Sequence, residues 1–179
     1  MAEPLRRETL GWLGLWLAIV GVAMFIRILP LDLIAGGWPG ADPVLVLTLA
    51  WVLRRPAHLP APAIGLVWLV EDLLTLRPPG LWALLVLGGT EFLRRRHAVV
   101  REIGLMLEWA MVAGVLVAMW LGQRLILVIV MVPQEPLGLS LIRLLGTVAL
   151  YPLAVFVLHV VLRVRKPAIG EVDDLGRKL

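Results

Sequence analysis

Several polar side chains of the sequence lie inside segments that are otherwise apolar. One such segment, WLVEDLLTLRPPGLWALL at residues 68–85, contains two adjacent acids. Counting residues from the expected ends of the segments places six polar side chains at a similar depth: Arg27, Glu71, Asp72, Gln123, Arg124 and Arg143. Carboxylates and guanidinium groups at membrane depth can bind a ligand or carry protons, or they can pair with one another and join helices.

We favour the second interpretation of this buried polar network. An unpaired charge in hydrocarbon is costly, and two acids with three arginines can satisfy one another without a ligand. A ligand or proton site that opens outward remains the alternative. Within the network, Asp72 should matter more than Glu71. The expected partners of Asp72 are Arg143, Arg124 and Arg27.

A second group of polar residues is expected nearer the opposite face of the membrane. Glu91 precedes Arg94 by three residues, which suits an ordinary pair on one helix face. Glu108 lies deeper, and His159 is one turn before Arg163 and is expected to bond locally. Two acids and a histidine could hold a metal or relay protons, but nothing in the sequence defines their mutual geometry, so we favour structural roles.

Catalytic and metal-binding motifs are missing from the sequence. Cysteine is absent, which excludes disulfides, thiolate metal sites and cysteine nucleophiles. No Ser/His/Asp arrangement, HExxH motif or phosphate-binding glycine loop is present. The net charge of +4 comes with basic residues in short clusters between apolar runs, which suits contact with anionic lipid better than nucleic acid. We therefore expect a protein that is not an enzyme and carries no cofactor.

The elements that position these side chains are expected to be membrane helices. The chain has 179 residues, of which 60% are hydrophobic and 17% charged, and a soluble domain of this length could not bury so much apolar surface. Proline, glycine and arginine clusters divide the chain into six expected spans at about 10–29, 44–53, 62–76, 81–93, 103–132 and 138–162. The fold class is an all-α polytopic membrane protein, with one six-helix domain at 1–166 and a polar tail at 167–179.

Pro78, Pro79 and Gly80 form the expected turn between the third and fourth spans. The segment 103–132 exceeds the membrane thickness as a helix, and it could break near Gly122 or continue as one long tilted helix. We favour the long helix because no strong helix breaker precedes Pro133.

Small residues recur every fourth position along this long segment, at Ala110, Gly114, Ala118 and Gly122. Such a stripe allows another helix backbone to approach closely. At 100° per residue, the stripe lies nearly opposite Glu108. If Glu108 faces the interior, the stripe could contact a partner protein. It could also pack against another helix of the same chain.

The arginines and lysines predict the orientation, because they collect on the cytoplasmic side of membrane proteins. With both termini on one side, that side holds Arg6, Arg7, Arg54, Arg55, Arg94, Arg95, Arg96, Arg101, Arg163, Arg165, Lys166, Arg177 and Lys178. The loops on the opposite side hold Arg77. The bias predicts six spans with both termini in the cytoplasm.

Three segments resemble the MreD family of rod-shape-determining bacterial membrane proteins. The stretch ADPVLVLTLAWVLRRP at 41–56 is similar to the second helix of the family, with an Asp, an apolar run containing an aromatic residue, and Arg-Arg-Pro. The segment 68–85 resembles the family's helix with one Asp followed by a Pro-x-Gly-Leu turn, on which Asp72, Pro78 and Gly80 fall. The stretch YPLAVFVLHVVLRVRK at 151–166 is similar to the family's last helix, with an aromatic-Pro pair followed by basic residues.

The resemblance implies a non-catalytic scaffold of the cell-wall elongation machinery in the bacterial inner membrane. Its implied partners are an MreC-like protein, a RodA-like glycosyltransferase, a penicillin-binding transpeptidase and the MreB filament. The family's fold is similar to the substrate-binding subunits of energy-coupling-factor vitamin transporters. A small-molecule-binding subunit of such a transporter is therefore the alternative function.

Overall fold

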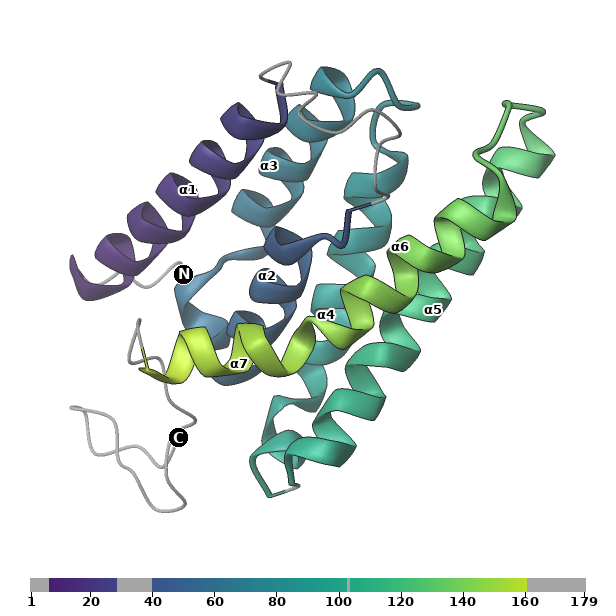
Figure 1. Ribbon diagram of the computed structural model, residues 1–179. Coiled ribbons are helices and arrows are strands. Elements are labelled where there is room, and N and C mark those ends of the chain that lie inside the picture. Colours follow the sequence, from purple (N-terminus) through teal and green to yellow (C-terminus); the bar gives the residue numbers. More distant parts are fainter. Residues whose placement is uncertain (1–6, 29–39, 103, 161–179) are drawn as a thin grey trace.

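The computed structural model describes residues 7–28, 40–102 and 104–160 of the chain, and these residues are helical for most of their length (Figure 1). Side chains are described for residues 9–26, 40–98 and 104–160. The helices are α1 (Arg7–Ile28), α2 (Pro43–Arg54), the short 3₁₀ turn η1 (Pro56–His58), α3 (Ala61–Leu74), α4 (Leu81–Glu102), α5 (Leu105–Ile129), α6 (Leu137–Ala149) and α7 (Tyr151–Val160). We call the end of the bundle with connections 75–80 and 130–136 the upper end.

Proline and glycine begin and end most of these helices, as the sequence predicts. Asp42 caps α2 by accepting a hydrogen bond from the Leu45 N–H at 3.0 Å, and Pro43 occupies the first turn, where its missing N–H costs nothing. Gly80 precedes α4 with φ of +85°, a conformation that few other residues adopt without strain. The connection between α3 and α4 therefore contains the expected Pro78, Pro79 and Gly80 turn.

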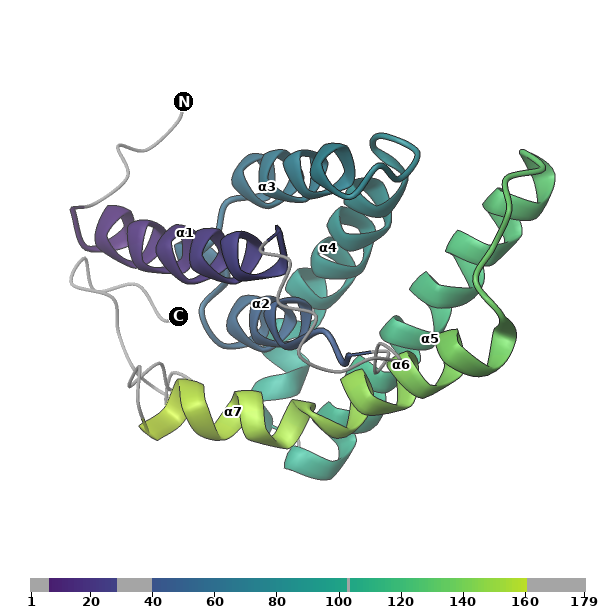
Figure 2. The ribbon, with the colours of Figure 1, turned by 45° about the horizontal axis from the view of Figure 1, so that its top comes forward.

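Helix α2 forms the centre of the bundle. It contacts α1, α4, α6 and α7, and Figures 1 and 2 show it enclosed between these helices. All of its twelve residues except Pro43 and Leu47 are buried. A helix of this length is about 18 Å long, which is shorter than the ~30 Å hydrocarbon core. Its apolar side chains therefore pack mainly inside the protein core and not against lipid.

The arginine cluster after residue 93 is part of helix α4, and the expected end of the fourth span at residue 93 is wrong. Helix α4 continues through Arg94 to Glu102. Arginine is a good helix former, and Arg94 also stabilises this turn by tertiary contacts. Its guanidinium donates to the Pro56 carbonyl at 2.5 Å and to the Leu59 carbonyl at 2.6 Å, and its Nε lies 2.8 Å from Glu91 Oε1. The next connection contains Gly104.

The long fifth helix is confirmed. Helix α5 has 25 residues and passes Gly122 without a break. It ends in a turn in which Met131 has φ of +57°, just before Pro133. The length of α5 corresponds to about 38 Å, so a tilted orientation suits a bilayer.

The last apolar segment is two helices, where a single helix over 138–162 was expected. Helix α6 ends at Ala149 and α7 begins at Tyr151. Pro152 lacks the N–H that a continuous helix would use to bond the Val148 carbonyl. That carbonyl instead accepts a hydrogen bond from the Trp109 indole at 2.8 Å, which also fastens α5 to this junction.

Apolar side chains cover much of the outer surface of the bundle. Within the described residues, three helical stretches are long and apolar enough to cross a membrane, namely Thr9–Ile26, Leu105–Ile129 and Leu137–Val160. No more than 22% of any of these stretches is buried inside the protein. An exposed apolar surface of this size is unfavourable in water, whereas lipid chains solvate it well.

Candidate functional site

Asp72 caps the start of helix α4 from inside the bundle. Its side chain is 0% exposed, and its Oδ2 accepts hydrogen bonds from the backbone N–H groups of Gly80, Trp82 and Ala83 at 3.0, 3.1 and 3.1 Å. The first N–H groups of a helix have no partner within the helix, and burial makes them costly to leave unpaired. The carboxylate therefore ties the last turn of α3 to the first turn of α4.

The expected pairing of Asp72 with Arg143 or Arg124 is wrong. Among the described residues, the side-chain hydrogen bonds of Asp72 come from backbone N–H groups, and Asp72 forms no ion pair with Arg124 or Arg143. The turn brings the amide donors of α4 to the carboxylate, and amides can satisfy it as well as a guanidinium can. Its neighbour Glu71 is also buried, and the side chain of Arg27 lies outside the described residues.

Replacing Asp72 by alanine should destabilise the protein through the loss of this cap. Each buried amide that loses its acceptor costs about 1–3 kcal/mol, so we expect a clearly lower Tm in detergent and a lower folded yield. Asp72→Asn keeps one carbonyl oxygen and should lose less. A wild-type Tm for Asp72→Ala would contradict the capping role.

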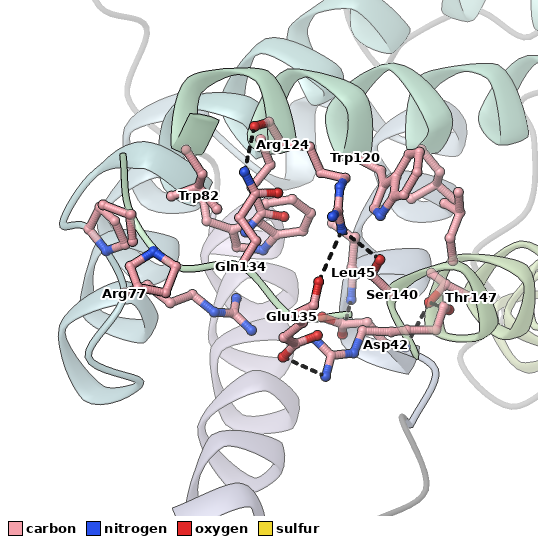
Figure 3. Close-up of a pocket in the computed structure, with 18 of the residues that line it drawn as sticks. Asp42, Leu45, Arg77, Trp82, Trp120, Arg124, Gln134, Glu135, Ser140 and Thr147 are labelled. Carbon is pink, nitrogen blue, oxygen red and sulfur yellow. Dashed lines mark hydrogen bonds and ion pairs between the residues drawn. The ribbon is translucent and has the colours of Figure 1, made fainter. Parts of the chain in front are cut away.

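A polar cavity lies at the upper end, between the start of α2, the α3–α4 connection, and the junction of α5 with α6 (Figure 3). Its volume is about 280 Å³. Three residues of the predicted network line it, namely Gln123, Arg124 and Arg143. The structure adds Arg77, which the sequence placed in a loop, and Glu135, which the sequence analysis did not single out.

The arginines of this cavity differ in their partners. Arg143 lies 3.2 Å from Glu135, but the two side chains are 39% and 52% exposed, so the pair contributes little stability. Arg124 donates to the Ser140 hydroxyl at 2.8 Å and to the Glu135 carbonyl at 3.4 Å, both uncharged acceptors. The guanidinium of Arg77 lies over the Trp82 ring at 6.0 Å from its centroid.

A second polar cluster is buried where α2, α5 and α7 meet. Arg54 Nη1 lies 2.7 Å from Glu108 Oε1, and the Tyr151 hydroxyl donates to the same carboxylate oxygen. The Arg54 and Glu108 side chains are 5% and 1% exposed, and Tyr151 is fully buried. Arg54 also donates to the Ala50 carbonyl at 3.1 Å. This ion pair with its tyrosine joins three helices that are far apart in the sequence.

Sequence reasoning missed this cluster. It assigned Arg54 to a cytoplasmic loop and grouped Glu108 with Glu91 and His159. The structure separates these three, because Glu91 pairs with Arg94 and His159 is exposed near the end of α7. No group of three potential metal-binding side chains occurs in the part of the chain that the structure describes. The sequence did contain a signal for this cluster. A glutamate deep in the membrane requires a buried hydrogen-bond donor, and the one tyrosine of the sequence was a candidate for that donor.

An apolar groove runs between α4 and α5 on the outer surface. It encloses about 440 Å³, and its lining includes Gly88, Gly89 and Phe92 of α4 and Gly114 and Ala118 of α5. Gly114 and Ala118 belong to the predicted small-residue stripe, and both are exposed, as is Ala110. Glu108 faces the interior, opposite to them.

The glycines beside this groove differ in how much room surrounds them. A Cβ atom at Gly114 would meet no other atom within 4 Å, so this part of the stripe is open. A Cβ atom at Gly122 would lie 3.2 Å from Leu85 Cδ2, so this end packs against α4. The stripe therefore packs against another helix of the chain at Gly122 and leaves an open face at Gly114.

The fold and these sites define a helical membrane protein with buried polar contacts at its helix ends. Comparison of the chain with protein-family models, with curated proteins and with solved structures found no match.

Proposed function

We propose that the chain is a non-catalytic membrane scaffold of the MreD type, which supports cell shape as part of the cell-wall elongation complex. In this proposal it is a multi-pass protein of the bacterial inner membrane, with six membrane segments and both termini in the cytoplasm. The upper end then faces outward. Its partners are an MreC-like protein, a RodA-like glycosyltransferase, a penicillin-binding transpeptidase and the MreB filament.

The observation that supports this proposal most is the position of the motif residues. Arg54 of the Arg-Arg-Pro motif and Tyr151 of the aromatic-Pro motif both contact the Glu108 carboxylate. Asp72 of the segment 68–85, which contains the Pro-x-Gly-Leu turn, caps α4. These motif residues make contacts that hold helices together, and such structural roles agree with a scaffold that has no catalytic activity.

We further propose that the groove between α4 and α5 receives the single transmembrane helix of the MreC-like protein. Helices associate in lipid mainly through close backbone approach and van der Waals contact, because burial against lipid brings little gain. Gly88, Gly114 and Ala118 provide that approach, and their side of the groove faces away from the core.

Depletion of the protein in its own organism tests the cellular role. If the chain supports elongation, depleted rod-shaped cells should become wide and then round, and a copy expressed from a plasmid should restore their shape. Cell width measured by microscopy over successive generations is the readout. Cells that keep their width after the protein has disappeared would contradict the proposal.

A small-molecule-binding subunit of an energy-coupling-factor-type transporter remains the second candidate. The observation that favours it is the cavity of about 280 Å³ at the upper end, which is close to the ~300 Å³ at which small-ligand pockets begin. Such a subunit should co-purify with membrane ATPases, whereas a scaffold should co-purify with cell-wall proteins.

A further inference from the structure

We propose that the cavity at the upper end binds a phosphate group, carried either by a membrane lipid as its headgroup or by a soluble molecule. This inference goes beyond the scaffold role and does not depend on it. It rests on the charges, the hydrogen-bond donors and the position of the cavity.

The charge balance of the cavity favours an anion. Arg77, Arg124 and Arg143 line it together with two carboxylates, those of Asp42 and Glu135. Glu135 pairs with Arg143, and Asp42 accepts the Leu45 N–H as the cap of α2. Among the described residues, neither Arg77 nor Arg124 forms an ion pair with a carboxylate. Three guanidinium groups and two carboxylates therefore give the cavity a net charge of +1 in a partly enclosed space, where an anion would be stabilised.

The donors of the cavity suit phosphate. Figure 3 shows Arg77 entering from the α3–α4 connection and Arg124 entering from α5, so the two approach from different sides. A guanidinium is planar and presents several N–H groups, which match the oxygens of a phosphate. Trp82 and Trp120 also line the cavity, and their indole N–H groups are buried and have no hydrogen-bond partner in the described part of the chain.

The surroundings of the cavity define the size of the ligand. A volume of about 280 Å³ accommodates a headgroup or a small phosphorylated molecule and not a large substrate. Leu76 and Leu127 line the same space as Arg77, and Leu76 is 93% exposed. An apolar rim next to cationic donors matches the boundary between a lipid headgroup and its acyl chains.

The test uses the full-length protein in a phosphate-free maltoside detergent. The probes are inorganic phosphate, short-chain phosphatidylglycerol, and a short-chain diacylglycerol that lacks phosphate. Binding is measured by isothermal titration and by the rise in Tm. We expect saturable binding of at least one phosphate-containing probe and none of the diacylglycerol. Tighter binding of phosphatidylglycerol than of inorganic phosphate assigns the site to a lipid, and equal or tighter binding of inorganic phosphate assigns it to a soluble ligand.

Two variants and a control connect this binding to the cavity. Arg77→Gln should weaken the binding by about tenfold or more, because it removes a charge-assisted contact. Arg124→Gln should do the same, while Arg96→Gln, on the exposed face of α4 outside the cavity, should not. The Arg77 side chain makes no hydrogen bond to the described residues, and its backbone N–H, which donates to the Asp72 carbonyl, is kept in Arg77→Gln, so this change should leave the fold intact. Absence of saturable binding by both phosphate probes, or equal binding by wild type and Arg77→Gln, would overturn the proposal.

Discussion

Glu108→Ala is expected to destabilise the protein more than the other single substitutions considered for its buried polar sites. The change leaves the Arg54 guanidinium in the interior without its carboxylate, and it removes the acceptor of the Tyr151 hydroxyl. Removal of one member of a buried ion pair typically costs about 3–5 kcal/mol. Thermal unfolding in detergent should show a large fall in Tm, and the folded yield should fall with it.

Two further variants separate loss of charge pairing from loss of packing. Tyr151→Phe removes one hydrogen bond and keeps the ring, so it should cost only about 1.5–3 kcal/mol. The double variant Arg54→Met with Glu108→Leu removes both charges, and it should recover much of the stability that Glu108→Ala loses. If Glu108→Ala unfolds at the wild-type temperature, the Arg54–Glu108–Tyr151 cluster does not stabilise the bundle.

Gly114→Leu is expected to abolish recovery of the MreC-like partner while the abundance of the protein stays unchanged. A side chain at residue 114 meets no atom of the chain within 4 Å at its Cβ, so the fold has room for it. The same side chain would fill the groove and prevent close backbone approach of a partner helix. Quantitative immunoblots of the membrane fraction and of the purified complex measure abundance and partner recovery together.

The chain offers two matched controls for this experiment. Gly89→Leu should deplete the protein itself, because its Cβ would lie 2.8 Å from Met119 Sδ and 3.0 Å from Val115 Cγ1 in the α4–α5 contact. Gly21→Leu adds the same side chain on the exposed face of α1, where a Cβ meets nothing within 4 Å, and should change neither quantity. Wild-type abundance together with wild-type partner recovery for Gly114→Leu would contradict docking in the groove.

Most helix limits could be predicted from the sequence, because they depend on local chemistry. Pro43 and Gly80 act within one turn of their own position, and the structure places helix ends beside both. The extension of α4 through Arg94 depends on the carbonyls of residues 56 and 59, which no local pattern reveals. The end of α6 was missed although Pro152 was visible, because the apolar run continues across it.

The polar sites could be predicted only in part. Their composition indicated that Asp72 and Glu108 would be buried and would have polar partners, and both do, although Asp72 Oδ1 has no hydrogen-bond partner among the described residues. Their partners depend on which helix ends meet. Asp72 bonds amides that follow it by eight to eleven residues, whereas Glu108 bonds Tyr151, which is 43 residues away. The position of Arg77 in the cavity could not be predicted either, because the sequence shows only that Arg77 lies in a loop.

Purification of the chain from its native membranes, with quantitative mass spectrometry of the proteins that accompany it, tests the proposed function most directly. The tagged wild-type protein should retain an MreC-like protein and a RodA-like glycosyltransferase in near-constant ratio to itself, and the Gly114→Leu variant should lose the MreC-like protein. Co-purification of the ATPase and transmembrane subunits of an energy-coupling module, without cell-wall proteins, would contradict the scaffold proposal and assign the chain to transport.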